Sequence, residues 1–346
     1  MKGALAVFDE SVGSGMAGLL VDGRLVDLMF DPASDDPRPR PEAIYRGILE
    51  RPLKGMHGAI LRLPDGQKAF LKDAKGLSPG TPIVVQVSTF ADEGKAAPVA
   101  RKLLFKSRYA IVTPANPGIN VARSIRDEEE RERLLEIAHG CLDDGDEGLI
   151  LRSACENEDS DTISSDIANM LEMCRTVLAG GDGTSPELLL DAPSAAVRAW
   201  RDWDEPDQVE NAVGSFERSG ILDYMDEALL DRAELGNSAW ISVEPTRALV
   251  AIDVNSGGDF SPGAALKTNL AACKEVSRQL LLRGLGGQVL IDFAPVNKKD
   301  RVKIEAALRA ALRRDGVDTI IAGWTPLGNL ELQRKRERFS LREAMK

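Results

Sequence analysis

Histidine and cysteine are scarce in this 346-residue sequence, which contains two of the first and four of the second. The histidines, His57 and His139, do not favour a His-based catalytic triad or a catalytic histidine pair. The cysteines lie far apart and form no CxxC, so we expect free thiols in a reducing cytoplasm rather than disulfides. They are Cys141, Cys155, Cys174 and Cys273.

Long apolar runs are also absent. No stretch approaches about 18 consecutive apolar residues, so we expect no membrane span. The opening residues Met1–Asp9 reach an acid too early for a signal peptide. No GxxxxGK loop for nucleoside triphosphates occurs. With 43% hydrophobic and 29% charged residues, the composition predicts a soluble globular protein. Together with the free thiols expected above, we expect it in the cytoplasm.

Acidic residues outnumber basic ones, with 55 Asp and Glu against 44 Lys and Arg. The net charge of −11 by itself argues against a nucleic-acid-binding protein. The distribution indicates otherwise. Residues 298–346 hold 13 Lys and Arg against 7 Asp and Glu, a net of +6, which leaves −17 on the first 297 residues. A basic segment on an acidic body is compatible with a polyanionic ligand, although a solvated helix face explains the charge equally well.

Short β-like runs separated by Gly and Pro turns fill the region from Tyr45 to about Val112. This spacing is typical of a small barrel of the OB type. Charged amphipathic helices are expected at 127–142 and 163–178, a strand at 148–153 and mostly helix at 217–234. Leu19–Val26, with its Asp-Gly pair, predicts a hairpin.

The clearest pattern is in the last third of the chain. An apolar run ends at Asp253, a helix is expected at 264–283, and a second apolar run ends at Asp292. A further helix at 299–314 and a short strand at 319–322 complete a β-α-β-α-β pattern. Such a pattern predicts a parallel sheet buried on both faces.

Asp253 and Asp292 each end an apolar strand, so a right-handed crossover would bring both carboxylates to one sheet edge. Two acids repel each other unless a cation lies between them, and Mg²⁺ prefers such oxygen ligands. Asn255 would lie on the same side of an extended chain as Asp253 and could orient a phosphate oxygen or a water. The alternative is that both aspartates are helix caps or solvated loop residues.

Five segments of this region, in order and spacing, resemble the catalytic segment of the ribonuclease E/G family. They are Ala251–Gly257, Lys267–Ala272, Glu275–Leu280, Gly286–Gly287 and Ile291–Phe293. Weaker similarity extends over most of the chain, for example at Ile44–Gly47, Ala69–Leu71, Pro114–Pro117 and Gly148–Ser153.

The resemblance implies an α/β multidomain fold. An RNase H-like domain would be split between 1–40 and 190–236, with an OB-type RNA-binding domain inserted at 41–108. A region sensing the 5′ end of RNA would span 109–189, and a DNase I-like catalytic domain 237–346.

The resemblance also implies residue roles. Asp253 and Asp292 would bind Mg²⁺, and Asn255 would contact the scissile phosphate. On the OB-type domain, Phe70 and Lys95 match RNA-contacting positions. A pocket for a 5′-monophosphate would use Arg152 and Ser153, with Ile111 backing it and Arg123 nearby. The alternative for Arg152 is an ion pair with a nearby acid such as Glu156 or Glu158.

Three departures from the family pattern matter. Ile60 stands where the family often has a second aromatic on the RNA-binding face, and Ser153 replaces a pocket threonine. The CPxC zinc-link and small domain do not follow within these 346 residues. A zinc-linked tetramer is therefore not expected, and a homodimer is left open.

The resemblance therefore predicts a Mg²⁺-dependent endoribonuclease that cleaves single-stranded RNA in RNA processing or decay. A non-catalytic RNA-binding or ribosome-maturation protein on the same fold is the main alternative. A metal-dependent phosphohydrolase acting on a small substrate is the third.

Overall fold

The computed structural model describes residues 2–9, 15–53, 55, 57–92, 94–142, 145–259, 261 and 263–346. The chain forms two compact units. Unit 1 comprises Met1–Asp36, Ser194–Ala196 and Pro206–Lys346, and unit 2 comprises Pro37–Pro193 and Val197–Glu205. Within the described ranges, no helix has the length and apolar character needed to cross a membrane. All four cysteines are free thiols, as expected.

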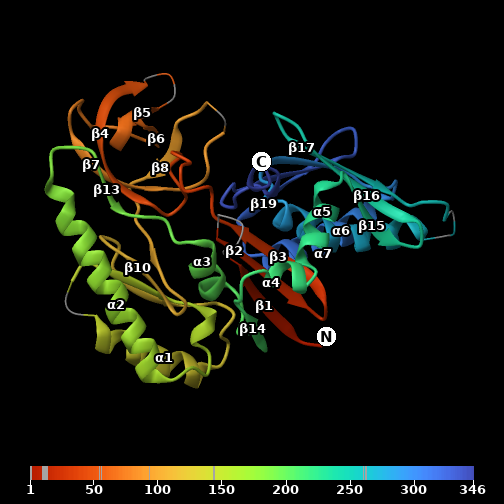
Figure 1. Cartoon of the computed structure of the whole chain (residues 1–346), viewed down its shortest axis with the longest axis horizontal. Coiled ribbons are helices and arrows are strands. Elements are labelled where there is room, and N and C mark those ends of the chain that lie inside the picture. The colour runs from red at the N-terminus through yellow and green to blue at the C-terminus, as the bar shows by residue number, and fades with distance from the viewer. Residues whose placement is uncertain are drawn as a thin grey trace. The chain divides into compact units, whose positions relative to one another are not determined.

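Five strands of unit 2 close into a barrel (Figure 1). They are β4 (Ile44–Leu53), β5 (Gly58–Arg62), β6 (Lys68–Lys72), β7 (Pro82–Val87) and β8 (Ala97–Ala100). Antiparallel pairing of β4 with β7 closes the barrel. A further strand, β13 (Glu187–Leu190), pairs antiparallel with the first residues of β4. Alternate residues such as Leu61 and Leu71 fill the interior. A closed five-stranded barrel, consistent with the predicted OB-type domain, is thus confirmed.

The rest of unit 2 is a four-stranded sheet covered by two helices. Its strands, in sheet order, are β11 (Gly118–Val121), β12 (Gly148–Leu151), β10 (Ala110–Thr113) and β9 (Phe105–Lys106). The predicted helices form as α1 (Glu128–Cys141) and α2 (Ser160–Ala179). The carboxylates of Asp127 and Asp159 cap their first turns by accepting backbone N–H groups. A short helix, α3 (Ala195–Asp202), follows β13.

Unit 1 contains a small sheet and two short helices. The sheet strands are, in order, β14 (Gln208–Glu210), β1 (Ala4–Asp9), β2 (Met16–Val21) and β3 (Arg24–Phe30). Asp22 and Gly23 join β2 to β3 with positive φ angles, which confirms the predicted hairpin. The expected helix at 217–234 was only partly right, because the chain forms α4 (Ser215–Arg218) and α5 (Ile221–Leu229) and then turns into a strand.

A six-stranded sheet with two long helices forms the rest of unit 1. Its order is β15 (Arg232–Gly236), β16 (Ala239–Pro245), β17 (Val250–Asn255), β18 (Gly287–Asp292), β20 (Leu330–Arg334) and β19 (Thr319–Trp324). The helices are α6 (Ala264–Leu282), α7 (Lys298–Arg314) and the short α8 (Leu341–Ala344).

The prediction of a parallel sheet buried on both faces was wrong. Only β17 and β18 pair in parallel, because β20 inserts antiparallel between β18 and β19. Burial alternates strictly along β18, where Val289 and Ile291 are buried while Gln288 and Asp292 are exposed. One face of the sheet therefore packs on the helices and the other is open.

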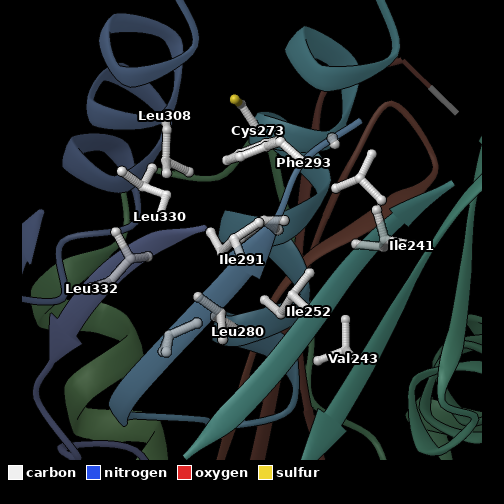
Figure 2. Close-up of a cluster of buried hydrophobic side chains, with 14 of the residues drawn as sticks. Ile241, Val243, Ile252, Cys273, Leu280, Ile291, Phe293, Leu308, Leu330 and Leu332 are labelled. Atoms are coloured by element: carbon white, nitrogen blue, oxygen red, sulfur yellow. The ribbon is translucent and has the colours of Figure 1, made fainter. Parts of the chain in front are cut away.

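The buried face carries the core of unit 1. Ile241, Ile252 and Ile291 project from neighbouring strands toward Leu280 of α6 and Leu308 of α7 (Figure 2). Burying each such side chain contributes on the order of 1.5–3 kcal/mol. This packing fixes the strands whose other face carries Asp253 and Asp292.

Candidate functional site

Asp253 and Asp292 are direct neighbours across the parallel pair of β17 and β18. Both side chains are exposed on the open face of the sheet, one residue beyond the buried Ile252 and Ile291. Adjacent strands lie about 4.8 Å apart, so the two carboxylates are close enough to share one ion. The structure thus brings together the two residues that the sequence singled out, and neither is a helix cap.

Asn255 lies two residues further along β17 and on the same face as Asp253. Its Nδ2 donates a hydrogen bond to Asp253 Oδ2 at 2.7 Å. This hydrogen bond restrains one carboxylate oxygen of Asp253. Among the described residues, none makes a comparable side-chain hydrogen bond to Asp292. Asn255 is therefore placed both to orient Asp253 and to contact a group bound beside it.

Among the residues that the structure describes, none neutralises the charges of this pair. Neither carboxylate forms a salt bridge with a residue in the described part of the chain. Two exposed, adjacent carboxylates with no protein cation fit a hard divalent ion such as Mg²⁺, which keeps several waters and takes one or two carboxylates. No group of three or more Asp, Glu, His or Cys that could hold a metal occurs among the described residues. A site here would therefore rely on water and substrate for its other ligands.

Asn269 was not assigned a role from the sequence, although it lies in a matched segment. It is fully buried on α6, where its Nδ2 donates to Ala294 O at 2.8 Å and its Oδ1 accepts from Ala294 N at 3.0 Å. Ala294 lies two residues after Asp292, so this pair of bonds fixes the chain where it leaves β18. A polar residue within the apolar stripe of the helix is the signal that could have revealed it.

Phe70 lies on the outer face of the barrel, on β6, opposite Ile60 on β5. Lys68 and Lys72 flank it at alternate positions of β6 and are exposed. The phenyl ring rests on Gly58, since a Cβ added there would lie 2.6 Å from ring carbons. The result is an aromatic surface between cations, which suits a single-stranded polyanion.

Lys95 lies just before β8, the strand that pairs with β6. Its side chain is exposed and forms a salt bridge with Asp92 at 2.6 Å. The structure therefore places Lys95 on the barrel but shows no contact between Lys95 and Phe70.

Arg152 follows β12 and is held by residues far away in the sequence. Its Nη1 donates to the carbonyl oxygens of Ser107 and Arg201, and its Nη2 donates to Asp202 Oδ1 at 2.8 Å. The expected alternative partners, Glu156 and Glu158, form no ion pair with it. Arg152 remains about a quarter exposed, so its guanidinium is restrained but accessible.

The Arg152 contact is the end of a chain of alternating charges. Arg201 forms two hydrogen bonds with Glu42, at 2.6 and 2.9 Å, and also binds Asp202. Lys106 Nζ also contacts Glu42, at Oε1, which accepts from Arg201 Nη2 as well. Burial acts to raise the pKa of Asp202, but hydrogen bonds and charges from Arg201 and Arg152 outweigh it and hold that pKa at about 2. Asp202 therefore stays ionised at neutral pH.

The other predicted pocket residues lie near the same sheet. Ile111 is half-buried on β10 opposite Ile150, and Ser153 begins a short turn directly after Arg152. Arg123 is exposed just beyond β11, which runs parallel to β12 and ends at the same edge. Arg123 shares that edge with Arg152, but no contact joins them in the structure.

A family model described as "Ribonuclease E/G family" matches residues 105–215 and 204–337. The chain belongs to the ribonuclease E/G family. The matched residues include Asp253, Asn255, Asp292 and Arg152, while the barrel with Phe70 and Lys95 precedes them.

Curated members of the ribonuclease E/G family align with most of this chain. Ribonuclease E of Synechocystis sp. is 29% identical over 357 residues, covering 87% of this chain and 53% of the relative. Ribonuclease G of Escherichia coli K12 is 26% identical over 364 residues, covering 87% and 74%. The chain thus spans about half the length of the ribonuclease E relatives that it matches.

Proposed function

We propose that the chain is a Mg²⁺-dependent endoribonuclease that cleaves single-stranded RNA in RNA processing or decay. The observation that carries this proposal is the pairing of Asp253 with Asp292 on an open sheet face, without a neutralising protein cation. Membership of the ribonuclease E/G family supports it. A relative's name alone does not assign the activity, because the chain matches only part of the longer relatives.

The roles of the residues follow from their positions. Asp253 and Asp292 would hold the ion, and Asn255 would orient Asp253 through its 2.7 Å bond while contacting the scissile phosphate. Bound Mg²⁺ would supply Lewis-acid polarisation of the phosphate and lower the pKa of a water. Asn269 would fix the backbone after Asp292 and so limit the positions that this carboxylate can take.

RNA would bind along the outer barrel surface. Phe70 would stack on a base, Lys95 would contact the backbone, and the cations of β6 would add charge. Single-stranded RNA suits this surface because its unstacked bases can reach an aromatic ring. Ile60, opposite Phe70, would add apolar contact without the stacking of a second aromatic.

We also propose that the segment around Arg152 binds a 5′-terminal monophosphate. Arg152 and Ser153 would contact the phosphate, Ile111 would back the nucleotide, and Arg123 would add charge at the same edge. A terminal monophosphate carries more charge than an internal phosphate and gains more from a guanidinium. Because Asp202 already binds Arg152, the phosphate would have to share or displace that carboxylate.

We also propose a finer division of the chain into domains. It assigns an RNase H-like domain to 1–40 and 190–236, the OB-type domain to 41–108, the 5′-sensing region to 109–189 and a DNase I-like domain to 237–346. Free thiols at all four cysteines are compatible with the cytoplasm as the site of action.

Incubating the protein with a fluorescent single-stranded RNA, with and without Mg²⁺, tests the proposal. We expect internal cleavage that requires the metal. RNA binding without cleavage would instead favour a non-catalytic RNA-binding protein. Turnover of small phosphate esters without RNA binding would favour a small-substrate phosphohydrolase.

A further inference from the structure

Trp324 and Arg301 form a stacked pair at one end of the large sheet. The Arg301 guanidinium carbon lies 4.6 Å from the centroid of the Trp324 ring. The indole N–H donates to Glu305 Oε1 at 2.6 Å, and the Phe293 ring lies 5.9 Å away. Because Arg301 and Glu305 are one turn apart on α7, the helix fixes the ring both on its face and at its edge.

The turn between β19 and β20 is shaped around this pair. Two hydrogen bonds between Thr325 and Asn329 close the turn. The Thr325 N–H donates to Asn329 O at 2.7 Å, and the Asn329 N–H donates to Thr325 Oγ1 at 3.1 Å. Gly328 has a φ of 100°, and a Cβ there would lie 3.2 Å from Arg301 Nη2, so a side chain would press on the guanidinium. Leu327, at the tip of the turn, is 92% exposed.

Arg301 is a cation without a carboxylate partner. It forms no ion pair with any residue that the structure describes. The two acids of its helix have other partners, since Asp300 pairs with Lys303 and Glu305 accepts the indole N–H. Stacking on an indole holds the guanidinium by its face and leaves its N–H groups, which point outward in the ring plane, available to an acceptor. A guanidinium held in this way is suited to a phosphate oxygen.

The pair lies at the same edge of the sheet as the carboxylates. Trp324 pairs with Leu330, and Leu330 pairs with Ile291, the residue before Asp292. Trp324 and Ile291 are therefore two strand spacings apart, roughly 10 Å. Trp324 lies on the helix-covered side of the sheet with Leu330 and Ile291, whereas Asp253 and Asp292 project from the open side. An RNA strand with its scissile phosphate at the two aspartates would therefore turn around the carboxyl edge of the strands to reach Arg301.

We propose that Arg301, Trp324 and Leu327 form a second RNA subsite beside the carboxylate pair. Arg301 binds a backbone phosphate near the scissile one, Trp324 positions Arg301, and Leu327 packs against the adjacent base. This inference rests on the proposed RNA substrate but assigns a surface outside the barrel and the Arg152 region. Single-strand binding sites combine cations for the backbone with surfaces for the bases. Leu327 offers a base apolar contact and not aromatic stacking.

Arg301→Gln and Arg309→Gln provide a matched test, because both remove one arginine from α7. Arg301 is partly buried beside Trp324, whereas Arg309 is exposed. Binding of a fluorescent single-stranded RNA is followed by anisotropy without Mg²⁺, at several salt concentrations. The logarithm of the binding constant falls as the logarithm of the salt concentration rises. Losing one phosphate contact should make this line shallower, reducing the magnitude of its slope by about 0.7. We expect this decrease for Arg301→Gln and not for Arg309→Gln.

Leu327→Ser separates the apolar contact from the charge. It should weaken binding and leave the salt slope unchanged, because no phosphate contact is lost. Equal slopes and affinities for Arg301→Gln and Arg309→Gln would overturn the subsite while wild-type RNA binding and cleavage remain intact. Failure of the wild-type protein to bind RNA at all would overturn the proposed function and the subsite together.

Discussion

Asp202 accepts a hydrogen bond at 2.8 Å from Arg152, a residue 50 positions earlier in the chain. The carboxylate also binds Arg201, so it lies between two guanidinium groups. The proposed phosphate-binding arginine is thus already oriented by an anion. This pre-arrangement reduces the entropy lost when a terminal phosphate binds.

RNA with a 5′-monophosphate should be cut faster than the same RNA with a 5′-hydroxyl. Arg152→Ala should abolish only that difference and leave cleavage of the 5′-hydroxyl form unchanged. Arg175→Ala, an exposed arginine of α2 paired with Glu147, serves as the control. Equal initial rates on the two RNAs by the wild-type protein would exclude 5′-end sensing without affecting the catalytic assignment.

The low pKa of Asp202 predicts a pH dependence of stability. The pKa is about 2 in the folded protein against 3.8 for an unperturbed aspartate. A carboxylate with a lowered pKa stabilises the fold above the unfolded value, and this contribution is lost as the pH falls through the folded value. Wild-type protein should melt at a higher temperature than Asp202→Asn at pH 7. Thermal melts should show that gap narrowing from about pH 4 to pH 2, and a constant gap would contradict the account.

Phe70→Ala should weaken binding of single-stranded RNA by about 1–3 kcal/mol if one base stacks on the ring. The Mg²⁺ concentration needed for half-maximal cleavage should not change. Leu188→Ala, which truncates an exposed apolar residue on β13 of the same unit, is the matched control. Unchanged anisotropy for Phe70→Ala would show that this face of the barrel does not stack RNA bases.

Asn269→Ala should lower both stability and cleavage. Removing the amide leaves the N–H and C=O of Ala294 without partners, at a cost of about 1–3 kcal/mol for each buried group. The chain after Asp292 then loses its anchor, so the Mg²⁺ requirement should rise. Asn269→Asp retains an acceptor for Ala294 N but places a buried carboxylate against Ala294 O, so it should be no milder than Asn269→Ala. Cleavage is measured over a Mg²⁺ titration at a temperature well below the melting point of the Asn269→Ala variant. If this variant needs no more Mg²⁺ than the wild-type protein, Asn269 does not position Asp292.

Local periodicity predicted the helices and the strands that carry the carboxylates. Helix α6 and the runs reaching Asp253 and Asp292 have strong apolar patterns, so their type could be predicted from the sequence. The end of β18 at Asp292 was also predicted, whereas β17 continues two residues past Asp253 to Asn255. β20 was not predicted because its apolar residues alternate with polar ones in a basic segment. Its place beside β18 depends on pairs 39 to 47 residues apart in the chain. The antiparallel pairing of β20, with that of β15, β16 and β17, makes the sheet mixed.

The site was predictable in part for the same reason. Asp253 and Asn255 are two residues apart, and their shared face follows from strand geometry. Asn269 and Ala294 are 25 residues apart, and Arg152 and Asp202 are 50 apart. Those contacts arise from tertiary packing, which no local pattern encodes.

Cleavage by the single variants Asp253→Asn and Asp292→Asn tests the central claim most directly. Single-turnover rates on single-stranded RNA are measured over a Mg²⁺ titration, and circular dichroism confirms folding. Asp318→Asn, an exposed aspartate paired with Lys335, is the control. We expect both site variants to fold normally and lose nearly all activity, with a raised Mg²⁺ requirement for what remains, while Asp318→Asn cleaves as wild type. Wild-type rates in either site variant would contradict the assignment of this carboxylate pair as the metal site.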